Sequence, residues 1–494
     1  MAGCSRFDGR SGGPQTRAVT HTARARWLPL SCCFAWLCLG SALVGCGDDG
    51  PHFVPASANP GQNLMVIDEG FDLTAAEFSG KLVAAYTFAC GNGGGGPSDA
   101  QGGGPLGIDG IASGSFDQQK QEIIAALATR DDSCHLRAGI SHKSDPLSSV
   151  ARFRTRWNAA VKDNQPLAAA FSGSEQQVLF PAVNQALSTF PFHGTATAGT
   201  AAHENDTVRL VLVERPLGDE STVTATYTCV AQADLDRFTA LYGDPTVMVA
   251  AASQPQSTLD ADLDRAIATH AVGLVNESFG SPARLFLEQL QAMYSCPATD
   301  FTGYFVTLGN LEQAQRGAAA GPAVLPLTVH AAGNDGAQID SVADAIDCDL
   351  GDPVNLSVGS LALDGTVSTF SNRGACVDLY APGESIVTPV AGGWYFPVDG
   401  TSFAGPLAAR TLSLTASTPY DAATAKQQLL AQNAANNEAI PPSAFPGDLF
   451  YQPVSTAQAL VDPAAQAPPP RWKPPVRVDL RRMLGPLERR RRGL

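Results

Sequence analysis

Short apolar runs alternate along the chain with segments whose apolar residues recur at helical spacing. The runs are bounded by glycine or turn residues and predict buried strands at residues 64–67, 81–88, 272–280, 323–332 and 354–363. The helical spacing predicts helices at residues 116–130, 262–270, 283–294, 402–414 and 420–433. This alternation of strands and helices is typical of an α/β fold with a mostly parallel sheet.

We expect one main domain over residues 63–440, because an α/β domain of this size often holds a single large core with insertions. The pattern is interrupted at about residues 89–188. This segment includes a Gly-rich tract at 91–104 that has little apolar surface to bury, and we interpret it as an insertion of unknown purpose. Residues 441–462 are assigned to a C-terminal extension of the domain. Residues 463–494 are first Pro-rich and then Arg-rich, and we expect a disordered tail.

The first residues are typical of a targeting segment. Arginines precede an apolar run at 27–39, which is too short to span a membrane comfortably and suits a secretory signal. The end of residues 1–45 resembles a bacterial lipobox, which implies cleavage before Cys46 and lipidation of its thiol. A plain signal peptide with an incidental cysteine is the alternative. Because residues 46–62 are polar and Gly-rich, they predict a tether. The expected location is the bacterial cell envelope, with a lipid anchor, or outside the cell if the lipobox is not used.

Charge is distributed unevenly along the chain. The formal net charge is −15, but residues 471–494 carry eight Arg and one Lys against Asp479 and Glu488, a net of +7. The remainder is therefore −15 − 7 = −22. An acidic body of this kind argues against nucleic-acid binding by the domain. We expect the Arg-rich end to be a solvated tail, with binding to anionic lipid or nucleic acid as the alternative.

The cysteine count is consistent with export. Of 11 cysteines, four would leave with the signal and Cys46 would be acylated. An even number then remains, which favours disulfides in an exported protein while leaving their connectivity open. These are Cys90, Cys134, Cys229, Cys296, Cys348 and Cys376. No Cys-x-x-Cys or His-Glu-x-x-His spacing occurs, so the sequence predicts no zinc site.

Two residues are candidates for a nucleophile and its base. Ser402 lies between small residues at the start of a predicted helix, where free backbone N–H groups and the helix dipole stabilise negative charge. Serine is also a common helix N-cap, so this position alone does not establish catalysis. His193 begins a helix of small residues, and imidazole exchanges protons near neutral pH. A lone histidine before glycine would ordinarily be structural.

Two further polar residues follow predicted strands. Asp68 lies at the carboxyl end of the first strand, the edge at which open α/β sheets place reactive groups. It is either a helix cap or a carboxylate that orients an imidazole. Asn334 follows the strand at 323–332 and offers a side-chain N–H, although an ordinary Asn-Asp-Gly turn is the alternative. With Ser402 and His193, these residues would complete a serine hydrolase site.

These motifs, in this order, resemble the subtilases, the subtilisin-like serine peptidases. They are Val-Ile-Asp-Glu-Gly at Asp68, His-Gly-Thr-Ala-Thr-Ala-Gly-Thr from His193, Ala-Ala-Gly-Asn-Asp-Gly at Asn334 and Gly-Thr-Ser-Phe-Ala-Gly-Pro at Ser402. Residues 276–280 are similar to the family's substrate-binding strand, and 368–374 and 378–383 carry further likeness. The resemblance extends over about residues 62–88 and 189–435.

The resemblance implies a subtilisin-like three-layer fold, an α/β architecture with a mostly parallel central sheet flanked by helices. It implies a serine endopeptidase in which Ser402 attacks, His193 is the general base and acid, and Asp68 orients His193. Asn334 would line the oxyanion hole. Polypeptide substrates would bind along Asn276, Glu277, Ser278, Phe279 and Gly280. The chemistry requires no cofactor or metal, structural calcium is left open, and we expect a monomer.

Three positions depart from the pattern that the family commonly shows. They are Ala196, Phe403 and Gly405, and none of them supplies a proton or a hydroxyl, so we expect changes in packing and pocket shape rather than loss of chemistry. A catalytically inactive peptide-binding protein on the same fold is one alternative function. A lipase or esterase of the α/β-hydrolase class is another, but Gly-x-Ser-x-Gly and the order Ser, Asp, His are absent.

Overall fold

The computed structural model describes most of the expected domain. The described residues are 51–90, 115–128, 134–140, 145, 147–189, 192–215, 229–253, 258–279, 283–318, 325–348 and 350–435. Cys46 and Gly280 lie outside them, as do the predicted signal, the C-terminal extension and the tail.

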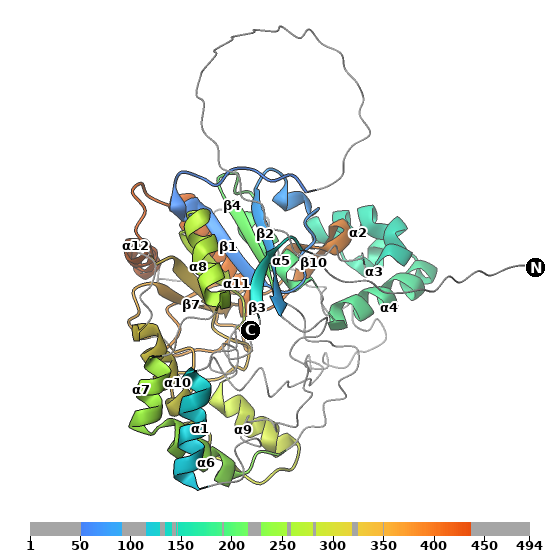
Figure 1. Cartoon of the computed structure of the whole chain (residues 1–494). Helices are drawn as coiled ribbons and strands as arrows, with labels where there is room; N and C mark the ends of the chain where they lie inside the picture. The colour runs from blue at the N-terminus through green and yellow to red at the C-terminus, as the bar shows by residue number, and fades with distance from the viewer. Residues whose placement is uncertain are drawn as a thin grey trace, which may run out of the picture. The chain divides into compact units, whose positions relative to one another are not determined.

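An eight-stranded sheet forms the centre of the domain, in the order β3-β2-β4-β1-β5-β6-β7-β8 (Figure 1). Its strands are β1 (Asn63–Asp68), β2 (Leu82–Cys90), β3 (Cys134–Ala138), β4 (Arg209–Glu214), β5 (Leu274–Glu277), β6 (Leu327–Ala331), β7 (Asn355–Leu361) and β8 (Leu379–Pro382). Neighbouring strands are parallel except β2 and β3, which are antiparallel. The predicted α/β class with a mostly parallel sheet is confirmed.

Strand β1 occupies the middle of the sheet. All six of its residues are buried, and it pairs with β4 on one side and β5 on the other. A continuous apolar run suits a strand that is covered on both faces. Asp68 is the last residue of β1 and is aligned with Glu214 at the end of β4. Both carboxylates therefore lie at the carboxyl edge of the sheet.

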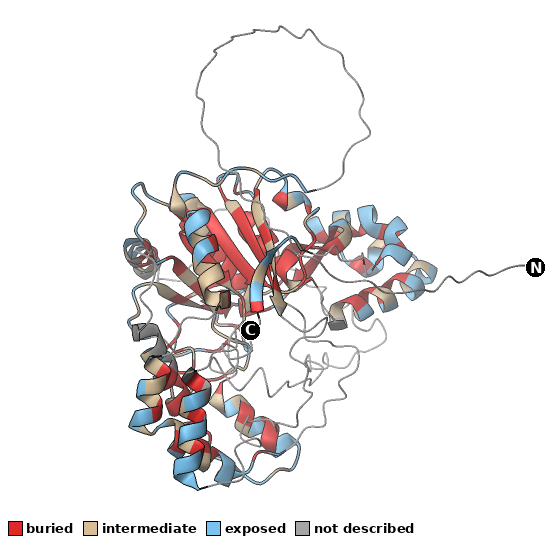
Figure 2. Cartoon of the chain, viewed as in Figure 1, coloured by how far each residue is buried: buried red, intermediate tan, exposed pale blue. Residues whose placement is uncertain are grey.

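Helices cover both faces of the sheet, which makes three layers. Leu64 and Val66 pack into one apolar cluster with α5 (His193–Ala202), α11 (Thr401–Thr415) and α12 (Ala422–Ala435). Met65 and Ile67 face the other way and pack with α8 (Thr258–Thr269). Figure 2 shows the strands largely buried between these layers. The expected arrangement of helices around a central sheet is therefore present.

A hairpin carries a further apolar cluster beside α5 and α11. Its strands are β9 (Ile386–Val390) and β10 (Trp394–Val398), and the helices packed on it are α2 (Arg154–Lys162), α3 (Leu167–Ala170) and α4 (Gly173–Thr189). Trp157 of α2 is fully buried, and its indole N–H donates to the Tyr395 carbonyl at 2.8 Å. The cluster also includes Phe192 and Phe403, which adjoin His193 and Ser402 in the sequence.

A separate helical cluster has its own apolar core. It contains α1 (Phe116–Ala128), α6 (Gln232–Tyr242), α7 (Pro245–Ala252), α9 (Arg284–Met293) and α10 (Thr302–Ala318). The segment 89–188 thus contributes to three parts of the structure. Its α1 joins this helical cluster, its β3 pairs at the edge of the sheet, and α2 to α4 cover the hairpin.

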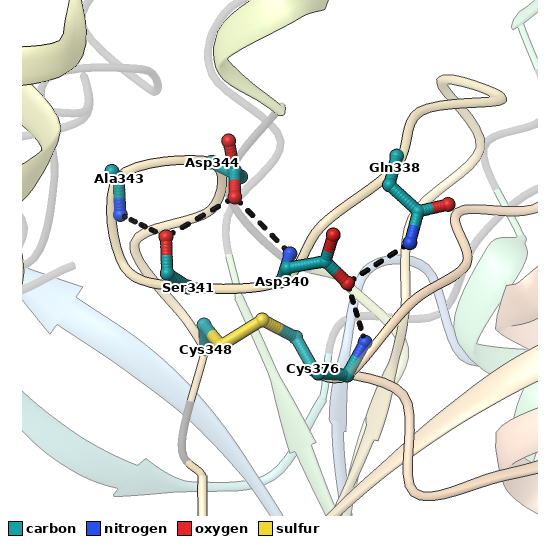
Figure 3. The surroundings of a disulfide bond; sticks show 8 residues. Gln338, Asp340, Ser341, Ala343, Asp344, Cys348 and Cys376 are labelled. Atoms are coloured by element: carbon teal, nitrogen blue, oxygen red, sulfur yellow. Dashed lines mark hydrogen bonds between the residues drawn. A yellow bond between two sulfur atoms is a disulfide. The ribbon is translucent and has the colours of Figure 1, made fainter.

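Two disulfides join cysteines that both belong to the described residues. One joins Cys229 to Cys296, and the other joins Cys348 to Cys376 beside the loop at 338–344 (Figure 3). Cys134 is also disulfide-bonded. Among the described residues there are also four short 3₁₀ helices: Pro60–Gln62, Ala76–Phe78, Ser148–Phe153 and Ala391–Gly393. In the part of the chain that the structure describes, no helix has both the length and the apolarity to cross a membrane.

Candidate active site

Asp68 is held in place by three hydrogen bonds at the end of β1. The residue is 2% exposed. Its Oδ1 accepts from the Glu69 N–H at 2.7 Å and pairs with His193 Nδ1 at 2.8 Å. Its Oδ2 accepts from the Thr197 hydroxyl at 2.8 Å. Such bonds satisfy a buried carboxylate and fix its orientation toward the imidazole.

His193 begins helix α5, and backbone contacts set the start of that helix. The Gly194 N–H donates to the Glu69 carbonyl at 2.6 Å, and the Thr195 N–H donates to the Gly70 carbonyl at 3.2 Å. A Cβ at Gly194 would lie 2.8 Å from the ring of Phe71, so the close approach requires glycine. The residues that follow β1 therefore position His193 over Asp68.

The surroundings of His193 favour its protonated form. Burial of the imidazole lowers its pKa, but attraction to Asp68, the hydrogen bond to Asp68 and the charge of Glu69 raise it. The net result is a pKa above the ordinary value of 6.5. The side chain keeps 27% of its surface exposed, so the ring is supported by Asp68 while part of it faces solvent.

Ser402 lies in the first turn of helix α11. The preceding Gly400 has φ 153° and ψ 152°, a conformation open almost only to glycine. The Ser402 hydroxyl donates to the Ser278 carbonyl at 3.1 Å. The Ser278 hydroxyl in turn donates to the Ser402 carbonyl at 2.9 Å. Because the first-turn N–H groups of a helix have no intrahelical acceptor, the Ser402 N–H is available to an anion.

The His193 imidazole and the Ser402 hydroxyl come from two helices that pack against each other. Phe403 follows Ser402, and its ring lies against the His193 ring with 5.7 Å between centroids. Helix α5 packs along α11 in this region. Asp68, His193 and Ser402, which are far apart in the sequence, are thereby brought to the same edge of the sheet. In a ligand-free site, catalytic hydrogen bonds are often longer than in the reacting complex.

Asn334 lies in the loop after β6 and is bound to the start of α11. Its Oδ1 accepts from the Thr401 N–H at 2.9 Å and from the Thr401 hydroxyl at 3.0 Å. The Thr401 hydroxyl also accepts from the Gly333 N–H at 3.2 Å. With the amide oxygen occupied, the Nδ2 group of Asn334 is the end that can donate. The residue is exposed, so this donor can reach a ligand beside Ser402.

The predicted substrate-binding residues differ in their surroundings. Asn276 is 1% exposed and donates to the Ser278 hydroxyl at 2.9 Å, which links both side chains to the backbone of Ser402. Glu277 is partly exposed, and its carboxylate lies 3.6 Å from His330 Nδ1. The Phe279 ring lies under the Arg215 guanidinium at 4.1 Å. Asn276 lies within β5, which pairs with β1 on one side and β6 on the other, so its main chain is already used by the sheet. The Ser278 side chain is buried, so any substrate contact at Ser278 would use the main chain.

Several residues around this site were not singled out from the sequence. Thr197 binds Asp68, Thr401 binds Asn334, and Asn372 binds the loop that carries Asn334. Thr197 follows His193 by four residues, the spacing that places two residues on one helix face, and this was a usable signal. Thr401 also had a usable signal in the sequence, because it is a hydroxyl residue directly before Ser402. Asn372 lies in the stretch 368–374 that resembles the family, but no role was assigned to it, because its side-chain partners lie more than 30 residues away.

A family model described as the subtilase family matches residues 60–451. The intracellular serine protease of Paenibacillus polymyxa is 48% identical over 59 residues, which are 12% of this chain and 18% of that protein. Subtilisin-like protease 1 of Trichophyton verrucosum is 41% identical over 76 residues, which are 15% of this chain and 18% of that protein. Both alignments cover only a small part of the relative's own length.

Solved structures with similar architecture were also found. The crystal structure of a cold adapted subtilisin-like serine proteinase aligns with 76% of this chain and 82% of that chain, at 19% identity and a TM-score of 0.32. The family assignment rests on the match of the family model.

Proposed function

This chain belongs to the subtilase family, and we propose that it is a serine endopeptidase that hydrolyses peptide bonds through an acyl-enzyme formed on Ser402. The observation that carries the proposal is the 2.8 Å hydrogen bond between Asp68 and His193 at the edge of the sheet where Ser402 lies in the first turn of α11. In acyl transfer by such a set of groups, the imidazole takes the proton of the hydroxyl, and the carboxylate orients the imidazole and stabilises its charged form.

The proposed reaction begins with attack of the Ser402 Oγ on the carbonyl carbon of the scissile bond. His193 Nε2 takes the hydroxyl proton and passes it to the leaving amine as the C–N bond breaks. A water molecule then attacks the ester carbonyl carbon, and the same imidazole takes its proton. The imidazole returns this proton to Ser402 Oγ as the ester C–O bond breaks and the product with the new carboxyl group leaves. Throughout, Asp68 accepts from Nδ1, which fixes the tautomer and stabilises the imidazolium.

The negative charge that develops on the substrate oxygen needs preorganised donors. The Ser402 N–H in the first turn of α11 and the Asn334 Nδ2 group are the donors that we propose. The two bonds between Asn334 and Thr401 support this role, because they join both donors to the same helix start.

Replacing Asn334 with alanine is expected to lower kcat by about 10²–10³-fold with little change in KM, because its N–H group would act mainly in the transition state. Steady-state kinetics on a peptide substrate measures the effect. The matched control is Asn59→Ala. The Asn59 side chain accepts from the Gly61 N–H at the start of a short 3₁₀ helix and donates to the Ala416 carbonyl, away from the site. Its replacement should leave kcat unchanged. Equal kcat for wild type and Asn334→Ala would exclude Asn334 from the oxyanion hole.

We propose that polypeptides bind in extended form along the main chain of residues 277–280, as an added strand. The burial of the Ser278 side chain supports recognition through backbone groups in this segment. Recognition through the backbone does not depend on the sequence of the substrate. A preference for particular substrate side chains would therefore come from pockets beside residues 277–280. Incubating the purified chain with a peptide library and sequencing the products by mass spectrometry tests the function. We expect internal cleavage that stops on inhibition by a fluorophosphonate, and a library left intact would contradict the proposal.

We further propose that the protein is exported and held at a membrane of the bacterial cell envelope by a lipid on Cys46. The support is the apolar run, the small residues before Cys46 and the polar tether that follows. The disulfides at Cys229–Cys296 and Cys348–Cys376 are consistent with an oxidising compartment.

A further inference from the structure

Asn372 is a buried amide whose four side-chain hydrogen bonds all go to the loop that carries Asn334. It is 1% exposed. Its Oδ1 accepts from the backbone N–H groups of Asp335 at 3.2 Å and Ala337 at 3.0 Å. Its Nδ2 donates to the Ala332 carbonyl at 2.9 Å and to the Asp335 carboxylate at 3.3 Å. One orientation of the amide thus satisfies two donors and two acceptors of this loop.

Asn372 supports the part of this loop at residues 332–337, where the backbone turns sharply on either side of Asn334. Two of its residues, Gly333 and Gly336, have φ of +100° and +63°. No described helix or strand covers residues 332–354, and the bridge between Gln338 and Arg373 lies beyond the turn, so the backbone groups next to Asn334 need other partners. The Asn372 N–H adds a fifth bond by donating to the Gly333 carbonyl at 3.0 Å. Asn372 therefore supplies hydrogen bonds to the backbone of this turn that a neighbouring strand would otherwise supply.

The segment that carries Asn372 is itself anchored. The Gly336 N–H donates to the Phe370 carbonyl at 2.7 Å, and Arg373 exchanges backbone bonds with Ala337 and Ile339 at 2.9 and 2.7 Å. Cys376 follows, and its disulfide to Cys348 closes the far end of this pairing (Figure 3). The two segments are therefore tied together on both sides of Asn372, so the amide presents a fixed surface to the loop.

We propose that Asn372 is a positioning residue that sets the placement of the Asn334 amide relative to Ser402. The inference rests on the proposed function and assigns that site a further residue. Asn334 is held at one end by Thr401 of α11 and at the other by the loop bound to Asn372. Asn372 touches neither the nucleophile nor the substrate in this account. Its effect on catalysis is transmitted through the geometry of the oxyanion donor, where small displacements are costly.

The test is the kinetics of Asn372→Ala measured on a peptide substrate with the full chain. We expect kcat to fall about 10–100-fold while KM changes less than about threefold, because a misplaced donor weakens transition-state binding and leaves ground-state binding intact. The decisive measurement is the double variant Asn334→Ala with Asn372→Ala. If Asn372 acts through Asn334, its removal adds less than about twofold to the loss caused by Asn334→Ala. Additive effects would overturn the proposal.

Asn205→Ala is the matched control for loss of a buried amide. Asn205 is also fully buried, and its Oδ1 accepts from Thr207 and Val208 in the turn before β4, at the opposite edge of the sheet. We expect it to lower the melting temperature as Asn372→Ala does while leaving kcat unchanged. A fall in kcat in Asn205→Ala equal to that in Asn372→Ala would mean that general destabilisation explains both, and the proposal would fail.

A second variant guards against misfolding of Asn372→Ala. A Cβ at Gly333 would lie 2.5 Å from the Asn372 Nδ2, so Gly333→Ala disturbs the same contact from the opposite side. It should also lower kcat selectively, and an unchanged kcat would count against the proposal. Failure of the proposed function is recognised separately, since wild type would then show no activity that depends on Ser402. If wild type is active and Asn372→Ala is folded with unchanged kcat, only the role of Asn372 is refuted.

Discussion

Replacing Ser402 with alanine is expected to lower kcat for peptide hydrolysis by about 10⁶-fold, because no other group can form the acyl-enzyme. Residual turnover over the uncatalysed reaction would come from the oxyanion donors and from binding. The substitution removes one hydrogen bond, to the Ser278 carbonyl, and keeps the small side chain that the first turn of α11 accommodates. The protein should therefore remain folded, which a melting curve checks.

The same helix supplies a control for this substitution. Ser413 lies further along α11, is fully buried and has no hydrogen-bond partner for its hydroxyl among the described residues. Ser413→Ala is expected to leave kcat unchanged, since it alters the same kind of side chain away from the reacting groups. Comparable activity of Ser402→Ala and Ser413→Ala, once contaminating peptidases are excluded, would refute the assignment of Ser402.

Replacing Asp68 with alanine is expected to lower kcat by about 10⁴-fold. The carboxylate is the partner of His193 Nδ1 at 2.8 Å, so its loss removes both the restraint on the tautomer and the charge that stabilises the imidazolium. Thr197→Val is the graded comparison, because it removes only the hydroxyl that donates to Asp68 Oδ2. It should cost about tenfold or less. A loss in Asp68→Ala no greater than that in Thr197→Val would contradict the role of Asp68.

The pH dependence of kcat/KM should differ between wild type and Asp68→Ala in a direction that the surroundings of His193 predict. His193 must be neutral to accept the proton of Ser402, and Asp68 holds its pKa above the ordinary value of 6.5. In wild type, kcat/KM should therefore fall with decreasing pH through a pKa above that value. In Asp68→Ala the attraction is lost and burial, which lowers the pKa, remains. The acidic limb of the residual activity should move to lower pH, and a limb that stays in place would assign the titration to another group.

The parts of this site that sequence reasoning could predict are those set by local patterns. Asp68 ends a run of buried apolar residues, His193 begins a helix of small residues and Ser402 begins another, and these elements were predicted from short windows. In a parallel sheet, groups at the carboxyl ends of strands converge at one edge. The rule places Asp68 at that edge, whereas the approach of His193 depends on the distant contacts of Gly194 with Glu69 and of Thr195 with Gly70.

What was not predicted depends on pairing between distant segments. The segment at 89–188 was interpreted as an insertion, but β3 within it pairs antiparallel with β2 at the edge of the sheet. Nothing in a short polar strand specifies which edge it joins, because that choice is made by the strand already present. The pairing of the cysteines and the contacts of Asn372 also depend on which distant segments meet. Asn372 lies in a stretch with likeness to the family, but its role depends on the approach of residues 332–337, which the sequence does not indicate.

The central claim is that Ser402 becomes covalently acylated, and a fluorophosphonate probe tests it most directly. The purified chain is titrated with the probe, and residual peptidase activity and the modified peptide are followed together by mass spectrometry. We predict that one equivalent of probe abolishes activity and that the adduct maps to Ser402, with no labelling of Ser402→Ala. Peptidase activity that survives complete modification of Ser402, or that disappears with the adduct on another residue, would contradict the account.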